Sequence, residues 1–139
     1  MKILRLYYLL PPNKGGMEKH VHILSKIQSK NNLVDIYFNN GEKTNINDVQ
    51  VLSKLKLFKI QPRFIGIFIF QFAVLFKLLN NNKKYDVIHV HGDWSALIFI
   101  YLIKTLTKSK VIVLSIHDQL TSSFKKKVLS FLIKQVDLI

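Results

Sequence analysis

The sequence of 139 residues contains no cysteine. This absence rules out disulfide bonds, iron–sulfur clusters, zinc sites with thiolate ligands and a cysteine nucleophile. Any catalysis must therefore come from histidine, carboxylate, hydroxyl or basic side chains, or from backbone N–H groups. A chain without cysteine also suits a reducing compartment, and we expect it to work in the cytoplasm.

Acidic residues are scarce as well, because 8 Asp and Glu stand against 21 Lys and Arg, which gives a formal net charge of +13. Such a chain attracts polyanions: phosphorylated ligands, nucleic acid or an anionic lipid surface. Only Arg5 and Arg63 are arginine, and this argues against nucleic acid as the partner, because the reading of guanine favours the guanidinium fork. The plain alternative is that most lysines lie on solvated helix faces.

The N-terminal segment lacks the features of a signal peptide. Its short apolar run carries Arg5 at the centre and is followed by Pro11 and Pro12 rather than by a small-residue cleavage site. We therefore interpret it as a strand. The chain length and an apolar content of 49% fit one globular domain with its own core over residues 1–139.

Short apolar runs alternate with longer segments of helical periodicity, which is typical of a parallel sheet covered by helices. Strands are predicted at residues 3–9, 33–38, 51–58, 86–90 and 111–115, and residues 136–139 read as the opening of one more. Helices are predicted at residues 16–29, 95–106 and 122–134. The fold class is therefore α/β: a Rossmann-like open parallel sheet with helices on both faces.

Periodicity also predicts which side chains of two helices face the core. In the first helix these are Met17, Val21, Leu24 and Ile27. In the last helix they are Phe124, Val128, Phe131 and Leu132.

Residues 64–79 contain five of the ten phenylalanines and only two strongly polar residues, Gln71 and Lys77. Sixteen helical residues reach roughly 24 Å, which is short of the roughly 30 Å hydrocarbon core of a bilayer. We therefore predict a buried helix, with a helix lying on a membrane surface as the alternative.

Residues that suit chemistry follow three of the predicted strands directly, at 11–18, 91–94 and 117–121. In an open parallel sheet the ligand crevice lies at the carboxyl ends of the strands, where helix N-termini and loop amides converge. The three segments should thus share one rim. Gly15 and Gly16 would let a diphosphate approach backbone N–H groups and the positive end of a helix dipole, unless they simply form a tight turn.

His89 and His91 alternate along a strand and should point to the same side, with Asp93 nearby. Imidazoles with a carboxylate suit zinc or iron, but a satisfied strand histidine followed by an active-site histidine explains the same residues without a third strong ligand. Trp94 serves either packing or stacking. His117, followed by Asp118, is the better catalytic candidate because a histidine at a strand end can face the crevice; the alternative is a surface loop.

Three segments, PPNKGGMEKHVHILSK, YDVIHVHGDWSALI and VIVLSIHDQL, resemble in order and spacing the N-terminal half of a GT-B glycosyltransferase of the family 4 type. Such enzymes have two Rossmann-like domains facing a cleft: the N-terminal one handles the acceptor, and the C-terminal one binds the nucleoside diphosphate sugar. The resemblance covers essentially the whole chain. It implies sugar transfer without a metal or other cofactor, because this class neutralises the leaving diphosphate with basic side chains and helix dipoles.

The resemblance also implies roles for individual residues. Gly15 and Gly16 match the glycine loop that comes close to the donor diphosphate and the acceptor. His117 matches the histidine that approaches the transferred sugar, and Asp118 beside it is expected to bind substrate. The loop of His91, Asp93 and Trp94 matches the acceptor side. Glu18 and His20 match a common GGxExH pattern to which we assign no chemical role.

The departure from the family concerns the donor-binding half. The basic pair that contacts the diphosphate and the Glu-rich motif that holds the nucleotide sugar belong to the C-terminal domain, which these 139 residues do not contain. We therefore expect no sugar transfer by this chain alone, and we expect it to work with a C-terminal domain or a partner subunit. The alternative is a non-catalytic subunit that docks on an anionic membrane surface.

Overall fold

The computed structural model contains one parallel sheet of five strands in the order β3-β2-β1-β4-β5. The strands are β1 (Lys2–Tyr7), β2 (Leu33–Phe38), β3 (Val51–Lys54), β4 (Val87–His91) and β5 (Val111–Ser115). The structure describes residues 1–9, 15–39, 51–55, 61–116 and 122–139. The predicted order of elements and the parallel sheet are confirmed.

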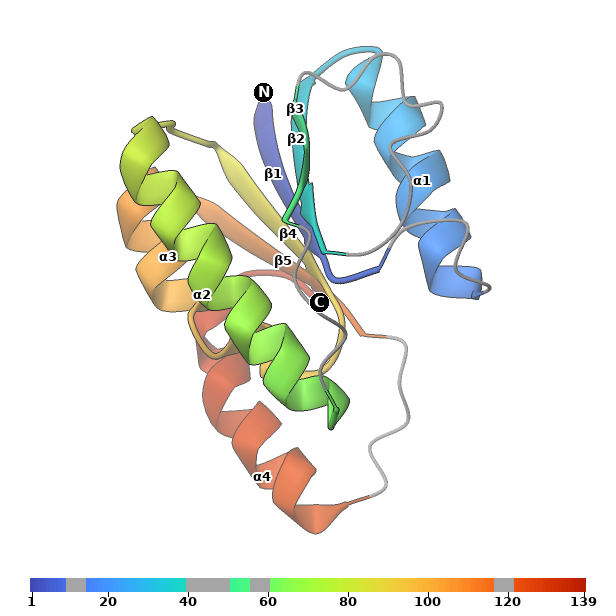
Figure 1. Cartoon of the computed structure of the whole chain (residues 1–139), viewed down its shortest axis with the longest axis vertical. Helices are drawn as coiled ribbons and strands as arrows, with labels where there is room; N and C mark the ends of the chain where they lie inside the picture. The colour runs from blue at the N-terminus through green and yellow to red at the C-terminus, as the bar shows by residue number, and fades with distance from the viewer. Residues whose placement is uncertain (10–14, 40–50, 56–60, 117–121) are drawn as a thin grey trace.

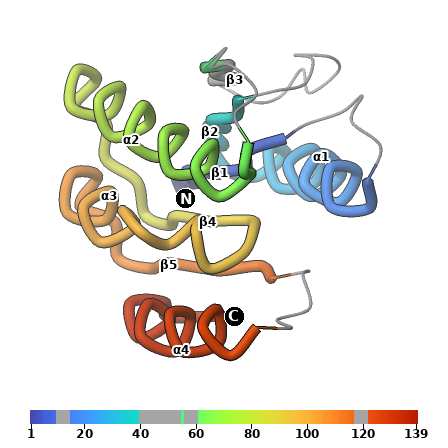
Figure 2. The backbone as a smooth tube through the Cα atoms, turned by 60° about the horizontal axis from the view of Figure 1, so that its bottom comes forward, coloured from blue at the N-terminus to red at the C-terminus, as the bar shows by residue number. Residues whose placement is uncertain are grey.

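Helices cover both faces of the sheet, as predicted (Figures 1 and 2). Alternating residues of β1 separate the two sides, since Leu4 and Leu6 join the main core while Ile3 and Tyr7 join a smaller core with Val21. The helical elements are α1 (Gly16–Ser29), α2 (Arg63–Asn81), η1 (Trp94–Leu97), α3 (Ile100–Thr107), α4 (Ser123–Leu132) and η2 (Ile133–Gln135). Helix α1 packs on the smaller core, and α2, α3 and α4 pack on the main core.

Several predicted elements differ from the structure by one or two residues at an end, the first strand among them, which ends at Tyr7 rather than at residue 9, and three others differ in further ways. The single helix expected at 95–106 is two elements, η1 and α3, because Asp93 caps η1 and the chain turns at Phe99 before α3 begins. Strand β3 ends at Lys54, and residues 56–58 of its predicted extension lie outside the described residues. The last helix ends as α4 at Leu132 and continues as the short η2.

The inward residues of α1 were predicted incorrectly at Ile27, which is exposed. The residues that α1 buries are Glu18, Val21 and Ser25. Part of the sheet surface beneath α1 is polar, since it contains the buried guanidinium group of Arg5. The helix therefore turns a partly polar face toward the sheet, which hydrophobic periodicity cannot predict.

Two of the four residues predicted to face inward on α4 are wrong. Phe124 and Phe131 are each 67% exposed, whereas Leu129 is 7% exposed and lies in the main core. Leu132 packs against that core as expected. The helix contacts η1 as well as the main core.

Helix α2 confirms the prediction of a core helix on one of its faces. Its inner face buries Ile67, Phe70, Val74 and Leu78 against the sheet. The helix is long and apolar enough to cross a membrane by length and composition alone. Its outer face is exposed along its whole length.

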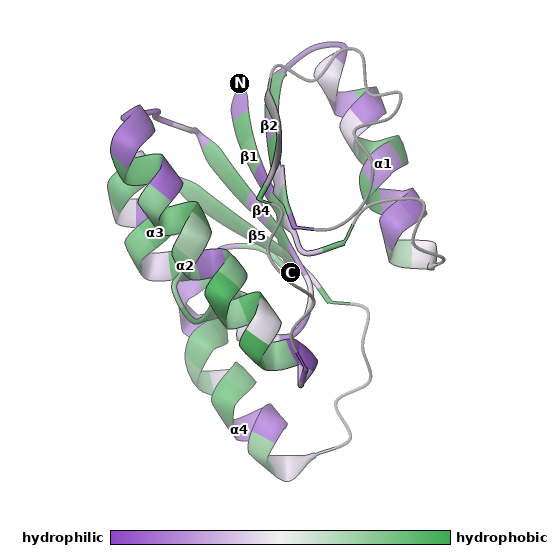
Figure 3. Cartoon of the chain, in the orientation of Figure 1, coloured by the Kyte–Doolittle hydropathy of each residue, from purple (hydrophilic) through white to green (hydrophobic). Residues whose placement is uncertain are grey.

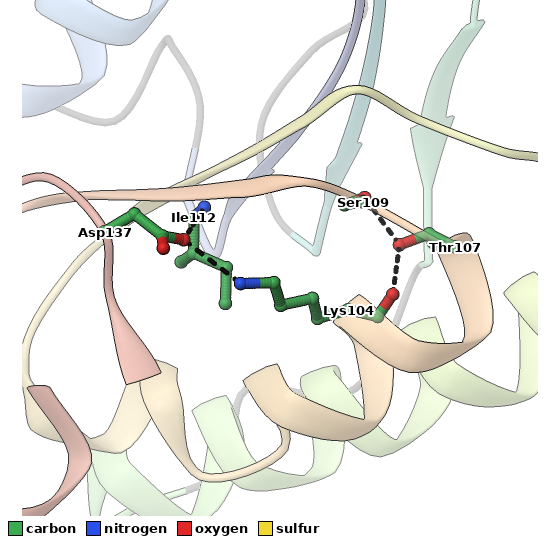
Figure 4. A network of polar contacts seen from close by, with 5 residues as sticks. All are labelled: Lys104, Thr107, Ser109, Ile112 and Asp137. Atoms are coloured by element: carbon green, nitrogen blue, oxygen red, sulfur yellow. Dashed lines mark hydrogen bonds and ion pairs between the residues drawn. The ribbon is translucent and has the colours of Figure 1, made fainter. Parts of the chain in front are cut away.

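The segment after η2 pairs with β5, which confirms the opening of a further strand. Leu138 forms a parallel bridge with Val113. The carboxylate of Asp137 accepts hydrogen bonds from the backbone N–H of Ile112 (2.8 Å) and from Nζ of Lys104 (3.1 Å), as Figure 4 shows. These two donors lower the pKa of Asp137. The last residues are thus tied to both β5 and α3.

Candidate functional site

Strands β1, β4 and β5 end together at one edge of the sheet. Tyr7 pairs with His91, and His91 pairs with Ser115, so these three residues form one row across the strands. The backbone N–H of Gly92 donates to the carbonyl oxygen of Ser115 (3.1 Å), which keeps the chain leaving β4 beside the end of β5. This row is the rim at which the three strands end; residues 11–14 and 117–121 of the predicted segments lie outside the described residues.

The N-terminus of α1 lies at the same edge. The ring of His20, one turn into the helix, lies edge-on to the ring of His91, with the centroids 6.2 Å apart. The two glycines before this turn differ in what surrounds them. A Cβ atom on Gly15 would lie 2.0 Å from Oε2 of Glu18, whereas a Cβ on Gly16 would meet nothing within 4 Å.

The two glycines were interpreted either as a loop that a diphosphate approaches or as a tight turn, and their different surroundings bear on this choice. Gly15 gives the buried Glu18 side chain room to fold back against it. A carboxylate in the first helical turn is favourable, since it interacts with the positive end of the helix dipole. No described residue packs beside Gly16, which suits the close approach of a ligand to the first turn of α1.

His89 and His91 face the same side of the sheet, as predicted. Their rings stack with centroids 4.0 Å apart. Tyr7 lies edge-on to His91 from the neighbouring strand, 5.9 Å away between centroids. His91 is buried at the rim, so a compact group of aromatic rings connects the end of β1, the end of β4 and the start of α1.

Beneath this group lies the guanidinium of Arg5, which is fully buried in the centre of β1. It donates hydrogen bonds to Oγ of Ser25 and Oε1 of Gln28 on α1, and it approaches Nδ1 of His89 at 3.3 Å. Burial lowers the pKa of Arg5 to about 10, which still leaves it charged at neutral pH. A buried charge needs such partners, and their placement fixes α1 on the sheet.

The same contact determines the protonation of His89. An arginine N–H can only donate, so Nδ1 of His89 accepts and the proton of the neutral ring is on Nε2. That N–H is 2.9 Å from Oγ of Ser115, to which it donates. Burial, followed by the charge of Arg5, lowers the pKa of His89 to about 4. His89 is thus the satisfied strand histidine, held neutral between β1 and β5.

The corner after β4 is held by local contacts. Gly92 has a φ of 153°, a conformation that favours glycine. Oδ1 of Asp93 accepts from the backbone N–H of Ser95 (2.9 Å) and from its hydroxyl group. Trp94 is half-buried and packs near Phe64 of α2, with ring centroids 6.3 Å apart. Asp93 and Trp94 therefore shape the corner, and their contact with substrate stays a prediction.

A small cavity of about 20 Å³ opens at this rim, which is room for roughly one water molecule. It lies between the ends of β1 and β4 and the N-terminal half of α2. Its polar lining comes from Arg63, Gln71, His91 and Asp93. Arg63 is exposed at the first position of α2 and brings a positive charge to the mouth of the cavity.

His117 and Asp118 lie outside the described residues. The described chain reaches Ile116 immediately after the end of β5 at the rim. Within the part of the chain that the structure describes, no group of three or more His, Asp or Glu side chains is arranged to hold a metal ion. The catalytic role of His117 and the substrate contacts of Asp118 stay predictions.

Sequence reasoning did not assign Arg5, Arg63 or Ser115 to the site. One signal was present: a lone arginine in the middle of an apolar strand must find buried hydrogen-bond partners. Arg63 gives no comparable signal, because a single exposed arginine before an apolar helix is common. Ser115 is recognisable only once its register beside His91 is known.

Comparisons with known proteins agree with this arrangement. The sequence matches the model of Glycosyltransferase Family 4 over residues 14–139. The fold is similar to the catalytic domain of starch synthase IV from Arabidopsis thaliana, solved with ADP and acarbose bound, with a TM-score of 0.62 and 20% identity. The match covers 84% of this chain and 34% of that one, so this chain spans about a third of its length. A search of the curated proteins gives no match.

Proposed function

This chain belongs to Glycosyltransferase Family 4, and we propose that it forms the acceptor-side domain of a GT-B enzyme. The enzyme would move a sugar from a nucleoside diphosphate sugar to a hydroxyl group of a glycan, a lipid-linked molecule or a small molecule. The observation that carries this proposal is the common rim, where the ends of β1, β4 and β5 meet the first turn of α1.

In this reaction an oxygen of the acceptor hydroxyl bonds to the anomeric carbon, and the bond from that carbon to the diphosphate oxygen breaks. The hydroxyl proton passes to the surrounding water, and the nucleoside diphosphate leaves with the bonding electrons. Negative charge therefore grows on the diphosphate in the transition state. Fixed dipoles and cations around that charge provide the main acceleration.

The described residues suit these tasks. The open side of Gly16 gives a phosphate access to the positive end of α1. Arg63 and the rim cavity lie on the side of β4 and α2, where we place the acceptor with Asp93 and Trp94. His117 would position the transferred sugar from the end of β5. We place this reaction in the cytoplasm, on the inner face of a membrane that carries surface polysaccharide or envelope precursors.

We further propose that transfer requires a second domain or a partner subunit that binds the donor. This chain spans 34% of the starch synthase chain that it matches. The test uses the chain alone and the chain reconstituted with a family donor-binding domain, each assayed for nucleoside diphosphate release from a panel of nucleotide sugars. We expect turnover only after reconstitution, and robust turnover by the chain alone would refute the requirement.

His117→Ala in the reconstituted enzyme tests the catalytic role. We expect kcat to fall by about 100-fold or more, the size of effect seen when one stabilising hydrogen bond in a transition state is removed. Circular dichroism should show an unchanged fold, and His117→Asn should retain more activity than His117→Ala. Unchanged turnover in both variants would remove His117 from the mechanism.

A second candidate is a non-catalytic subunit that docks a split enzyme on a membrane. The exposed outer face of α2 favours it. The two candidates differ in one result. A non-catalytic subunit would leave turnover by a separate catalytic partner unchanged when His117 is replaced, whereas the proposed acceptor-side domain would not.

A further inference from the structure

The outer sides of α2 and α3 form one apolar surface. Exposed large side chains repeat every four residues along α2 and continue onto α3, and hydropathy colouring shows both helices as mainly hydrophobic (Figure 3). The surface consists of Phe64, Phe68, Phe72 and Phe76 on α2 with Leu102 and Leu106 on α3. We call it the α2–α3 face. Contiguous exposed apolar surface of this kind marks an interaction site.

The face is broad and runs along the helices. Between the C-terminal halves of α2 and α3 lies an apolar groove of about 310 Å³, lined by Phe72, Phe76, Leu102 and Leu106 among others. The 19 residues of α2 extend over roughly 28 Å. The face thus offers an extended apolar surface rather than a single deep pocket.

Positive charges predominate around the face, and the exposed Asp86 is the acidic residue that directly follows Tyr85. Residues 61–85 and 94–116, which include both helices, contain no Asp or Glu. The loops that follow the two helices lie side by side, because the backbone N–H of Tyr85 donates to the carbonyl oxygen of Thr107 (3.1 Å). These loops expose Lys84, Lys108 and Lys110 near the groove end of the face.

Two neighbouring lysines are already neutralised and do not belong to this group. Lys83 pairs with the buried Asp35 (3.0 Å). Lys104 pairs with Asp137 (3.1 Å). No such ion pair is found for the other three within the described residues.

We propose that the α2–α3 face docks on the surface of an anionic lipid bilayer, with α2 lying in the plane of the membrane. Aromatic and leucine side chains would enter the boundary between headgroups and acyl chains, while the three lysines contact anionic headgroups. The helix does not cross the bilayer, because its inner face is part of the core and Gln71 bonds to Ser95 (2.8 Å) and Phe99 (3.0 Å) on the neighbouring element.

The charge pattern favours a bilayer over a second copy of this chain. Two copies meeting through this face would bring together two lysine groups and two chains of formal net charge +13, which repel each other. Anionic headgroups, in contrast, carry the charge opposite to that of the three lysines and would lie under the whole face. A protein partner with an acidic border would satisfy the same charges, and the experiment below distinguishes it.

The docked orientation also brings the rim close to the lipid. Phe64 at the N-terminal end of the face is a neighbour of Trp94 at the corner of the candidate site. Under the proposed function, an acceptor linked to a lipid would then reach the rim from the membrane. This extension rests on the proposed function, whereas vesicle binding does not, so the two can fail separately.

The experiment measures flotation of the purified chain with vesicles of phosphatidylcholine alone and of phosphatidylcholine mixed with phosphatidylglycerol. We expect the chain to float with the anionic vesicles and to be released by salt. Phe72→Gln combined with Phe76→Gln should weaken binding at least tenfold, because both side chains are mostly exposed and would be inserted. Phe76→Gln alone should give an intermediate loss.

The lysines are tested by a triple variant, Lys84→Gln, Lys108→Asn and Lys110→Gln, in which asparagine suits the positive φ at position 108. Each lysine near an anionic surface contributes about fivefold to binding, so the triple variant should bind about 100-fold more weakly. Binding that remains should depend less on phosphatidylglycerol.

Matched controls come from α1 on the opposite side of the sheet. The first control combines Ile23→Gln with Ile27→Gln and removes two exposed apolar side chains. The second control replaces three exposed lysines by Gln: Lys19, Lys26 and Lys30. Both should bind vesicles nearly as the unchanged chain does. Circular dichroism and the Tm of every variant confirm that the fold is retained.

Four results would overturn the proposal. The first is that the chain does not float with either vesicle preparation. The second is that the α1 control variants lose as much vesicle binding as the variants of the α2–α3 face. A third such result is a dimer in sedimentation velocity that the Phe72 and Phe76 substitutions dissociate, together with no vesicle binding. That result would assign the face to a second copy of the chain. The fourth is that an acidic partner protein binds through the face while the chain does not bind vesicles. That result would assign the face to the partner protein.

Trp94 is the only tryptophan and reports the orientation. Vesicles containing brominated phosphatidylcholine should quench its emission in the unchanged chain but not in the combined Phe72 and Phe76 variant. Flotation without quenching would refute the placement of the rim beside the lipid.

Discussion

Acidification should destabilise this domain through His89. The ring is neutral in the folded protein, where burial and Arg5 lower its pKa to about 4. In the unfolded chain a histidine has its ordinary pKa of about 6.5. As the pH falls below 6.5 the unfolded chain takes up the proton first, so the free energy of unfolding decreases until the folded ring is also protonated near pH 4.

The size of the effect follows from the difference between the two pKa values. Each pKa unit corresponds to about 1.4 kcal/mol, so His89 should remove about 3 kcal/mol of stability between pH 6.5 and pH 4. Above pH 6.5 its contribution should be complete and constant. This loss is a large part of the stability of a typical small domain.

The assay compares the unchanged chain with His89→Asn by urea unfolding from pH 7 to pH 4, followed by circular dichroism and the emission of Trp94. Asparagine retains an acceptor for Arg5 but does not titrate. The stability difference between the two proteins should therefore shift by about 3 kcal/mol in favour of the variant as the pH falls. A constant difference, or a ring of His89 that titrates near pH 6.5 in an NMR experiment, would refute the reasoning.

Three further substitutions test packing at the site. Gly15→Ala should destabilise the fold by about 1 kcal/mol, because its Cβ displaces Glu18; Gly16→Ala should be neutral or slightly stabilising, and a thermal melt in which the two variants behave alike would contradict this difference. Gln71→Leu should cost about 2 kcal/mol in urea unfolding, because the buried carbonyl of Ser95 and the part-buried N–H of Phe99 lose their hydrogen bonds; a stability equal to that of the unchanged chain would show that those groups find other partners.

The sheet could be predicted because its strands are short apolar runs buried on both faces. The rim could then be predicted from the residues that directly follow these strands, because parallel strands end at the same edge of a sheet. No side-chain contact had to be known. Gln71 shows where this reasoning stops: it was read as an interruption of an apolar run, whereas it is buried and bonded to the element next to α2. A pattern of hydrophobicity does not indicate which polar side chain will find a partner inside.

The same limit explains the helix faces that were predicted incorrectly. Ile27 is exposed because polar side chains of α1 face Arg5, and Phe131 is exposed because α4 turns Leu129 rather than Phe131 into the main core. In both helices tertiary contacts outweigh periodicity. The break between η1 and α3 was missed because neither glycine nor proline marks residues 98 and 99.

Arg5 has a consequence for how this domain changes during evolution. Its side chain bonds to two residues of α1 and approaches one of β4, so replacing it alone would leave buried polar groups without partners. Relatives that lack an arginine at this position should therefore also differ at Ser25, Gln28 and His89. In an alignment of such relatives the four positions should covary, and the angle of the first helix should differ along with them.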